Sequence, residues 1–493
     1  MKNIEQLLLN LKKYERFGEP NKLVSAIEFD SRKVTRCDQE GVALYVAQKG
    51  TLSDGHDFIE QAIAHGAGFI VCEKLPENLH PEVVYIKVAD SSIALGRLVS
   101  AFYDYPSSKL KLVGITGTNG KTTTVTLLYR LFLNMGFKTG LLSTIENKIN
   151  EEIIPATHTT PDAVAINKLL KQMVDADCEY AFMEVSSHAI CQHRTEGLSF
   201  TGAVFSNITH DHLDFHKTFA EYIKAKKLFF DKLPKKSFAL TNIDDKNGLV
   251  MVQNSKATVF TYSLINLADF KGKVLENSFE GMLMTINNRE TWFKLAGKFN
   301  AYNLLAIFGT ASLLGLSQEE VLVKMSELES AAGRFQCIKG SENRQAIVDY
   351  AHTPDALQNV LVTIRDIVQQ NFEVITVVGC GGDRDHSKRP IMADMVCRYS
   401  NKVILTSDNP RSEDPSQILA DMEKGVPQHL KKNVLVIENR KDAIKTATML
   451  LPKNGILLIA GKGHENYQEI KGIKYPFDDR KIVSDFFENE ETH

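Results

Sequence analysis

The chain of 493 residues lacks the features of a membrane, nucleic-acid-binding or disulfide-rich protein. No apolar run approaches the roughly 20 residues that cross a bilayer, and residues 1–6 carry an early acid that predicts an amphipathic helix, not a signal peptide. The net charge of −3 disfavours binding to nucleic acid or to an anionic membrane. Seven scattered cysteines with no C-x-x-C pair predict reduced thiols in a cytoplasmic protein.

The length predicts about three domains. Residues 106–109, Pro-Ser-Ser-Lys, have the composition of a linker between the first and second of them. From residue 334 onward, strand and helix patterns alternate. We expect five buried parallel strands there, at 346–348, 374–378, 403–405, 434–437 and 456–459.

The stretch Gly117-Thr118-Asn119-Gly120-Lys121-Thr122 predicts a phosphate-binding loop. It lies between an apolar run and a helical pattern, which is the strand–turn–helix context that such a loop needs. The glycines let backbone N–H groups face an anion at a helix N-terminus. Lys121 can reach the β- and γ-phosphates, and the Thr122 hydroxyl can bind Mg²⁺. The common loop has glycine where this chain has Ile115, so a plain strand–helix turn is the alternative.

Polar groups follow two more predicted strands of the central region. Glu184 ends an apolar stretch, at the place where nucleotide enzymes put a second Mg²⁺ ligand. Residues 210–216 contain three histidines and two aspartates, which predicts a metal site; a polar loop with one core histidine is the alternative.

Residues 159–162, Thr-Thr-Pro-Asp, predict a helix start with the threonines in the cap region. The lysines within 222–228 have the spacing of a solvated helix face.

Three predicted strand ends near the C-terminus also carry polar clusters: Gly382-Asp383-Arg384-Asp385, Asp408-Asn409-Pro410-Arg411 and Gly461-Lys462-Gly463-His464-Glu465. Ligands of open α/β sheets bind at the carboxyl ends of the strands. Arginines suit carboxylates and acids suit amines, so we expect a pocket for an amino acid with charged groups at both ends. Three unrelated loops are the alternative. The run 379–382 does not predict NAD binding, because position 384 is arginine where the dinucleotide pattern needs glycine.

Together these motifs resemble those of the Mur ligases, in the same order along the chain. Further matching stretches are Asp30-Ser31-Arg32, Asp54-Gly55-His56, 184–188 with Gln192 and Arg194, 211–214, 222–226, 297–303, 333–335 and 349–355. The similarity runs almost end to end, and it is strongest to the members that add the third residue of the peptide. It implies an α/β protein with three domains: an N-terminal UDP-substrate domain (1–106), a central ATP-binding domain with a parallel sheet of the P-loop ATPase kind (107–333), and a Rossmann-like amino-acid-binding domain (334–493).

The resemblance also implies roles for individual residues. The catalytic residues would be Lys121, Glu184, His212 and Lys226, the last matching a lysine that carries a carbamate. Mg²⁺ would bind Thr122, Glu184, His212 and the carbamate on Lys226. ATP would contact Gly117, Thr118, Asn119, Gly120, Lys121, Thr122, Thr123, Asn300, Asn303 and Arg334. The UDP-linked dipeptide would contact Ser31, Thr159, Thr160, Ser186, Gln192 and Arg194. The added amino acid would contact Arg384, Asp408, Asn409, Arg411, Gly461 and Glu465.

The activity implied is ATP-dependent amide ligation through an acyl phosphate. It would join meso-diaminopimelate to UDP-N-acetylmuramoyl-L-alanyl-D-glutamate during peptidoglycan precursor synthesis, in the cytoplasm, by a monomer with no nucleic-acid or membrane partner. Asp-Asn-Pro-Arg at 408–411 resembles the diaminopimelate-adding form, whereas the lysine-adding branch departs from it at the arginine. A folylpolyglutamate synthetase is disfavoured by 30–32 and 408–411. Two competing functions come from different classes: a metal-dependent phosphohydrolase built on 210–216, and a non-catalytic, nucleotide-gated binding module.

Overall fold

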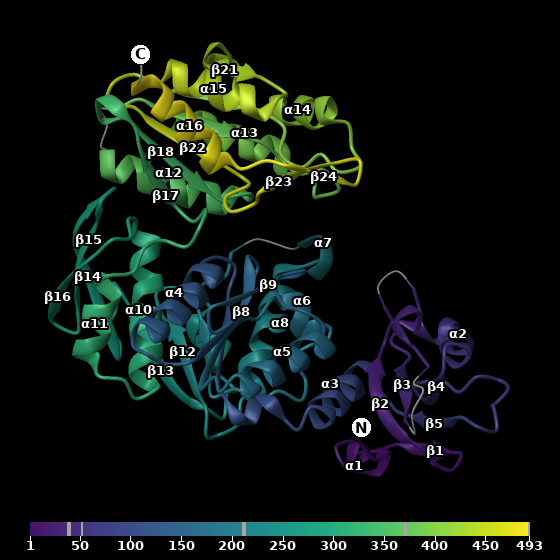
Figure 1. Ribbon diagram of the computed structural model, residues 1–493. Coiled ribbons are helices and arrows are strands. Elements are labelled where there is room, and N and C mark those ends of the chain that lie inside the picture. Colours follow the sequence, from purple (N-terminus) through teal and green to yellow (C-terminus); the bar gives the residue numbers. More distant parts are fainter. Residues whose placement is uncertain (37–40, 51–52, 210–212, 369–371, 492–493) are drawn as a thin grey trace.

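The computed structural model describes residues 1–36, 41–50, 53–209, 213–368 and 372–491. Three large sheets follow one another along the chain, and helices cover each of them (Figure 1). The central body, drawn in blue to teal-green, lies between the N-terminal body in purple and the C-terminal body in green to yellow. The predicted three-domain α/β architecture is therefore confirmed, while the boundaries at 106 and 333 stay a prediction.

The N-terminal sheet has the strand order β1-β5-β4-β3-β2, and only β1 runs antiparallel to its neighbour. Its strands are β1 (Glu15–Phe17), β2 (Leu23–Glu28), β3 (Gly41–Val46), β4 (Ala67–Cys72) and β5 (Val84–Lys87). Its helices are α1 (Ile4–Leu8), η1 (Ser31–Lys33), η2 (Gly55–Phe58), α2 (Ile59–Ala64) and α3 (Ser91–Phe102). Helix α3 buries Leu95, Leu98 and Val99 in the core of this sheet, so it anchors the domain before the chain enters the next one.

The central sheet has eleven strands in the order β16-β15-β14-β13-β12-β11-β6-β10-β7-β8-β9. They are β6 (Lys111–Thr116), β7 (Thr139–Leu142), β8 (Glu146–Ile149), β9 (Glu152–Pro155), β10 (Tyr180–Glu184), β11 (Gly202–Phe205), β12 (Phe238–Asn242), β13 (Thr258–Ser263), β14 (Phe270–Ser278), β15 (Gly281–Ile286) and β16 (Arg289–Phe293). The middle of the sheet is parallel, as predicted, and antiparallel strands extend both edges. Strand β6 lies between β10 and β11, so the phosphate loop that follows it leaves from the middle of the sheet.

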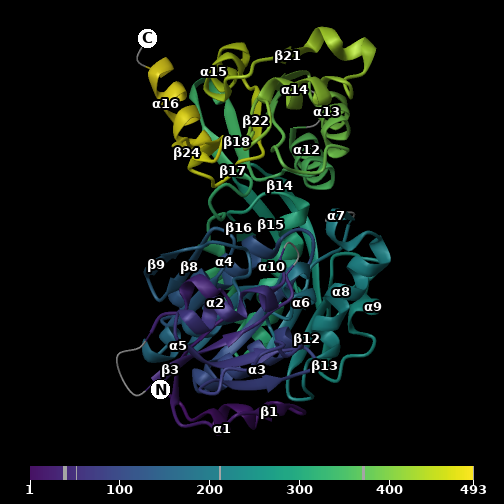
Figure 2. The same ribbon diagram turned by 90° about the vertical axis from the view of Figure 1, so that its right-hand side faces the viewer.

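The helices of the central domain pack on both faces of this sheet (Figure 2). They are η3 (Pro106–Lys109), α4 (Lys121–Asn134), α5 (Ala163–Asp175), α6 (Ser187–Cys191), α7 (Leu213–His216), α8 (Phe219–Asp231), α9 (Gly248–Val252), α10 (Lys298–Leu313) and α11 (Gln318–Ser326). Helices α4 and α10 share one hydrophobic core, and α5 and α8 share the other. Within the part of the chain that the structure describes, every helix is too short or too polar to cross a membrane.

The C-terminal sheet has the order β17-β18-β22-β19-β20-β21. Its strands are β17 (Gln336–Lys339), β18 (Gln345–Asp349), β19 (Val374–Val378), β20 (Lys402–Leu405), β21 (Val434–Val436) and β22 (Ile456–Ala460), and a separate hairpin is formed by β23 (Tyr467–Ile470) and β24 (Ile473–Pro476). The helices are η4 (Ser341–Asn343), α12 (Pro354–Val368), α13 (Lys388–Tyr399), α14 (Pro415–Glu423), η5 (Gln428–Asn433), α15 (Arg440–Leu450) and α16 (Asp479–Glu491). All five predicted parallel strands are present.

Several local predictions were wrong. Residues 106–109 do connect α3 to β6, as predicted for a linker, but they form a packed turn. Pro106 and Ser107 are buried, and the Ser107 hydroxyl accepts a hydrogen bond from the Ser199 N–H at 2.9 Å. Helix α5 begins at Ala163 and is capped by Asp162, so the two threonines precede the cap. Strand β21 is an exposed edge, not a buried strand. The antiparallel strands β8, β9, β14, β15, β16 and β17 were not predicted.

Candidate active site

The phosphate loop depends on two glycines. Gly120 has φ +85°, and a Cβ there would lie 2.4 Å from Oδ1 of Asn303 on α10. A Cβ on Gly117 would lie 1.9 Å from the Ser206 hydroxyl oxygen. Only glycine adopts the first conformation freely, and only glycine leaves room for the neighbouring side chain at the second. The missing glycine at position 115 is not needed, because Ile115 is a buried residue of β6.

Residues just after β11, the strand that pairs with β6, hold this loop in place through hydrogen bonds. The Ser206 hydroxyl donates to the Asn119 carbonyl oxygen at 2.7 Å, and Oδ1 of Asn207 accepts from the Asn119 N–H at 2.9 Å. Lys121 Nζ donates to the carbonyl oxygens of Gly117 and Thr118, each at 2.9 Å. The loop is thus fixed in shape, and its lysine lies over it at the N-terminus of α4.

Glu184 is the last residue of β10 and is fully buried. One of its carboxylate oxygens accepts from the Thr144 N–H at 2.7 Å, whereas the other accepts no hydrogen bond from the described residues. Thr122 and Glu184 line the same cavity, which lies between the central and C-terminal domains. A buried carboxylate oxygen without a donor is costly unless a cation or water meets it, so Glu184 and Thr122 suit a hard cation such as Mg²⁺.

Lys226 is also buried, at 1% exposure on α8. Its Nζ donates to the Gly117 carbonyl oxygen at 2.8 Å and lies 4.8 Å from the centre of the Tyr222 ring. Lys224, two residues earlier, is 70% exposed, so the lysine run has both a solvated and a buried face. The spacing alone indicated only the solvated face, whereas the resemblance correctly implied that residue 226 points inward.

The histidine-rich stretch is only partly described. His216 is buried, lies 2.9 Å from the Ser187 hydroxyl and packs on the Tyr222 ring, so it is a core histidine. His210, Asp211 and His212 lie outside the described residues, and the metal role of His212 stays a prediction. Among the residues that are described, no three His, Cys, Asp or Glu side chains gather as a metal cluster.

Most residues expected to bind the UDP-linked dipeptide gather at the carboxyl end of β10. The Thr160 hydroxyl donates to the Glu184 carbonyl oxygen at 2.8 Å and accepts from the Ser186 N–H at 3.0 Å. Arg194 donates to the Thr160 carbonyl oxygen at 2.6 Å and to Oε1 of Gln192 at 2.9 Å. Burial lowers the pKa of Arg194.

Two other residues expected at the dipeptide have different surroundings. The Thr159 hydroxyl accepts from Thr144 at 3.1 Å. Ser31, by contrast, belongs to the N-terminal domain, where its hydroxyl donates to Oε1 of Gln61 at 2.9 Å. The substrate roles of all these residues stay predictions.

In the C-terminal domain the predicted amino-acid pocket forms around a buried lysine. Lys462 Nζ donates to Oδ1 of Asn409 and to Oε2 of Glu465, each at 3.0 Å, and lies 3.8 Å from Asp408. Asn409 Nδ2 donates to the same Glu465 oxygen at 2.8 Å. Lys462 is 0% exposed and was not among the predicted site residues. The three polar clusters are therefore not unrelated loops, because Lys462 ties two of them together.

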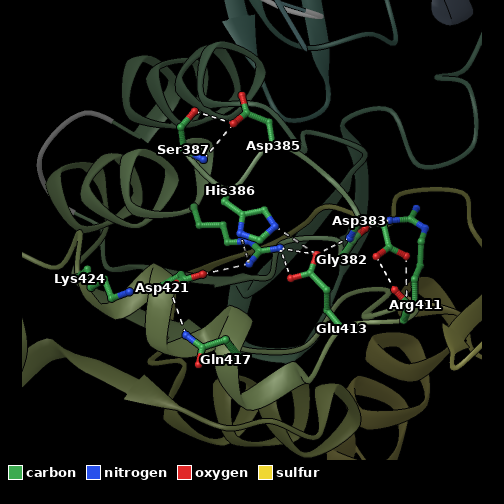
Figure 3. Close-up of polar contacts among 12 residues, drawn as sticks. Gly382, Asp383, Asp385, His386, Ser387, Arg411, Glu413, Gln417, Asp421 and Lys424 are labelled. Atoms are coloured by element: carbon green, nitrogen blue, oxygen red, sulfur yellow. Dashed lines mark hydrogen bonds and ion pairs between the residues drawn. The ribbon is translucent and has the colours of Figure 1, made fainter. Parts of the chain in front are cut away.

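The clusters at 382–385 and 408–411 are joined by contacts drawn in Figure 3. Arg411 has φ +52° and donates from Nη1 to the Gly382 carbonyl oxygen at 2.6 Å. The Ser412 hydroxyl donates to Asp383 at 2.5 Å. Glu413 accepts two hydrogen bonds from Nη2 of the buried Arg389, at 2.9 and 2.8 Å. The loops that carry Arg384 and Arg411 thus form one unit.

One cavity of about 430 Å³ lies between the central and the C-terminal domain. The predicted site residues that line it are Thr118, Asn119, Gly120, Lys121, Thr122, Thr123, Thr159, Glu184, Asn303, Arg334, Arg384, Asp408, Asn409, Arg411, Gly461 and Glu465. Those that do not line it are Ser31, Gly117, Thr160, Ser186, Gln192, Arg194, Lys226 and Asn300. The buried Asn300 accepts from Asn303 at 3.0 Å, so it supports a lining residue.

Direct hydrogen bonds hold the two sides of the cavity together. Arg334 donates to the Thr122 hydroxyl at 3.2 Å. Asp355, in the first turn of α12, accepts from Nδ2 of Asn119 at 2.7 Å and from the Thr209 hydroxyl at 2.9 Å. The phosphate loop is therefore in contact with the C-terminal domain.

Residues 349–352 also line the cavity, although no site role was predicted for them. The buried Asp349 accepts from the Phe335 and Ala351 N–H groups at 2.6 and 2.7 Å, and burial raises its pKa. The Tyr350 ring lies 4.5 Å below the Arg334 guanidinium. The sequence signal was present, since 349–355 is one of the matching stretches, but it did not say which side chains face the cavity.

Comparison with known proteins agrees with this geometry. Three family models match: "Mur ligase family, catalytic domain" over residues 23–103, "Mur ligase middle domain" over 115–311 and "Mur ligase, glutamate ligase domain" over 333–463. A relative from Cytophaga hutchinsonii is 58% identical over 466 residues, which is 94% of this chain and 95% of the relative. The chain belongs to the Mur ligase family.

That relative is named UDP-N-acetylmuramoyl-L-alanyl-D-glutamate–2,6-diaminopimelate ligase. A Mur ligase of the same name from Phocaeicola vulgatus is 54% identical over 487 residues, covering 99% of this chain and 100% of the relative. A solved structure titled with that ligase name superimposes with a TM-score of 0.70 at 31% identity, covering 98% of this chain and 99% of the other. As a Mur ligase, the chain is an ATP-dependent ligase.

Proposed function

We propose that the chain joins meso-diaminopimelate to the D-glutamate of UDP-N-acetylmuramoyl-L-alanyl-D-glutamate, using ATP, in peptidoglycan precursor synthesis. The observation that carries the proposal is the shared cavity. A phosphate loop lines one wall of it, and the other wall carries Arg384 and Arg411 together with Asp408 and Glu465. Relatives that are 51–58% identical to this chain carry the name of the ligase with this activity.

The reaction needs two steps because a carboxylate is a poor electrophile. In the first, the γ-phosphoryl group of ATP passes to the D-glutamate carboxylate, giving an acyl phosphate and ADP. In the second, an amine of the amino acid attacks the acyl carbon, the C–N bond forms, inorganic phosphate leaves and the amine gives up a proton. The phosphate loop and Lys121 would position the triphosphate, and Arg334 would meet the charge that develops on the transferred group.

The dipeptide and a divalent cation would lie next to the phosphate loop. Thr160, Ser186 and Arg194 would position the dipeptide carboxylate at the end of β10. Thr122, Glu184, His212 and a carbamate on Lys226 would hold Mg²⁺, which screens the converging anions when it is bound.

The amino-acid pocket has the charges that meso-diaminopimelate needs. Arg384 and Arg411 would bind its carboxylates, and Asp408 and Glu465 would bind its ammonium groups. L-Lysine has the same spacing between its two amino groups but lacks the distal carboxylate, so it would leave Arg411 without a substrate partner. We therefore expect a strong preference for meso-diaminopimelate over lysine. We further propose that the protein is a monomer and that it is cytoplasmic; the six described cysteines, all free thiols, support the second part.

The test measures phosphate release with each substrate left out in turn, followed by mass spectrometry of the product from a mixture of amino acids. The proposal requires rapid release only when ATP, the UDP-linked dipeptide and the amino acid are all present, and a product that contains diaminopimelate. A lysine product would identify a lysine-adding ligase, and activity with a folate would identify the synthetase. Release without the amino acid would indicate a phosphohydrolase, and no release at all a binding module.

A further inference from the structure

The hairpin β23–β24 lies along the loop that carries Arg411, and two backbone–backbone hydrogen bonds and two that involve a side chain join the two segments. The contacts are Glu469 N–H to Asn409 Oδ1 at 2.9 Å, Arg411 N–H to the Glu469 carbonyl oxygen at 3.0 Å, Lys471 N–H to the Arg411 carbonyl oxygen at 2.7 Å, and Gln468 Nε2 to the Asp408 carbonyl oxygen at 2.7 Å. This pairing holds Arg411 in its left-handed conformation. It also puts the side chain of Glu469 beside the guanidinium of Arg411.

The two side chains form a weak ion pair within the protein. Glu469 Oε2 lies 3.8 Å from Arg411 Nε, and the side chains are 26% and 25% exposed. On its other side the guanidinium donates to the Gly382 carbonyl oxygen. Asp383 is near but is held by Ser412, and Glu413 is held by Arg389. Glu469 is therefore the acid that is placed to share Arg411 with an incoming carboxylate.

We propose that Glu469 is a specificity-determining residue, which competes with the distal carboxylate of the amino acid for Arg411. This inference rests on the proposed function, because it needs a substrate with that carboxylate. The substrate must displace Glu469 from Arg411. Part of the free energy gained from the new ion pair is therefore offset by the loss of the ion pair between Glu469 and Arg411. When an amino acid without the distal carboxylate occupies the pocket, Glu469 keeps Arg411 neutralised. Glu469 thus reduces the preference for meso-diaminopimelate over L-lysine that Arg411 provides.

The direction of the effect separates this role from a structural one. Glu469→Gln keeps the backbone pairing and the size of the side chain but removes the charge. We expect KM for meso-diaminopimelate to fall by about twofold to fivefold, the range that a partly exposed ion pair contributes. We expect kcat/KM for L-lysine to fall, because Arg411 then has no charged partner, and KM for ATP to stay unchanged. A variant that merely disordered the hairpin would raise KM for diaminopimelate.

The experiment compares kcat and KM for both amino acids in the parent, Glu469→Gln, Arg411→Ala and the double variant. Glu423→Gln, an exposed acid at the end of α14, controls for the change in net charge. The inference requires Glu469→Gln to act in the parent background and to have no effect when Arg411 is alanine. It also requires the control to behave like the parent.

Two outcomes would overturn the inference alone. One is a parent that prefers meso-diaminopimelate while Glu469→Gln leaves KM unchanged or raises it. The other is an equal effect of Glu469→Gln with and without Arg411, which would mean that the charge acts elsewhere. A parent that does not use meso-diaminopimelate would instead overturn the proposed function, and with it this inference.

Discussion

At the residue scale, Lys226 makes the most direct test of the candidate metal site. A neutral side chain of similar length, as in Lys226→Met, would fill the same buried space but could neither donate to Gly117 nor carry a carbamate. We expect kcat to fall by at least about 100-fold, because several kcal/mol of charge stabilisation would be lost. The thermal stability should change little.

Carbon-13 NMR of protein equilibrated with labelled CO₂ provides the second measurement. A carbamate resonance is expected in the parent and not in Lys226→Met. Lys224→Met, on the exposed face of the same helix, is the matched control and should keep both activity and resonance. Full activity without any carbamate signal in the parent would rule out the modification.

His464 gives a prediction about pH. Burial, followed by the charge of Arg334, lowers its pKa from 6.5 to about 3. As the pH falls below 6.5 the unfolded chain takes up a proton at this residue and the folded chain does not, so stability is lost between these two values. His464→Gln should therefore lose less free energy of unfolding than the parent between about pH 7 and about pH 5. Equal losses in urea titrations of the two proteins would contradict this assignment.

At the scale of the elements, the N-terminal turn of α13 holds the loops of the amino-acid pocket. Glu413→Gln would remove the negative charge and one of the two acceptor oxygens that face the buried Arg389, and would weaken the contact with the 382–385 loop. We expect a loss of about 1–3 kcal/mol in stability, less than for a fully buried pair because Glu413 is partly exposed. KM for diaminopimelate should rise while KM for ATP stays the same.

Thermal melts and substrate titrations check both parts of this prediction. Asp394→Asn breaks an exposed ion pair on the same helix, with Arg398, and should change neither quantity. A Glu413→Gln protein with the parent's melting temperature and the parent's KM values would show that Arg389 does not position the pocket.

The elements also show what the sequence could predict. Strands of continuous apolar residues, such as β18, β19 and β22, were predicted because burial on both faces leaves a clear pattern. The antiparallel strands β8, β9 and β14 to β17 lie at or toward the edges of their sheets, and none of them is buried throughout. They depend on their neighbours for pairing, so no continuous apolar run marked them. In the same way, the spacing of Lys226 was that of a surface residue. Contacts with residues distant in the sequence bury Lys226, and only the resemblance to the Mur ligase family predicted its inward position.

Some of the site residues could be predicted from the sequence, and others could not. The glycines, Lys121 and Glu184 carry local signals, since strand ends and tight turns are readable from neighbouring residues. Lys462 lies in a predicted strand-end cluster, but its role was not predicted, and Glu469 carries no local signal. Their partners Asn409 and Arg411 lie about 50 or more residues earlier and meet them only through the parallel sheet order. Such supporting side chains need the folded structure to be found.

At the scale of the whole molecule, Asp355 links the C-terminal domain to the phosphate loop. Asp355→Ala would remove the acceptor of the hydrogen bonds from Asn119 and Thr209. Hydrogen bonds to a charged group contribute roughly 1.5–3 kcal/mol each when buried, and less here because the carboxylate is partly exposed. We expect the unliganded protein to shift toward a more open arrangement of domains, with a larger radius of gyration in X-ray scattering.

Ligands should largely reverse that change, since they contact both sides of the cavity. The variant with an ATP analogue and the amino acid bound should therefore return toward the parent's radius. Asp366→Ala, an exposed acid on the same helix α12, is the control. An unliganded Asp355→Ala protein with the parent's scattering curve would show that this contact does not hold the domains together.

The continuous cavity has a consequence for inhibitor design. The phosphate loop and the Arg411 loop open into the same space, so a single compound could carry a phosphate mimic at one end and a diamino diacid at the other. Once one end is bound, a short linker would hold the other at an effective concentration of about the millimolar range. Two weak fragments would then combine into one strong ligand, provided that the domains are closed. Such a compound would bind the closed form selectively and trap the enzyme in it.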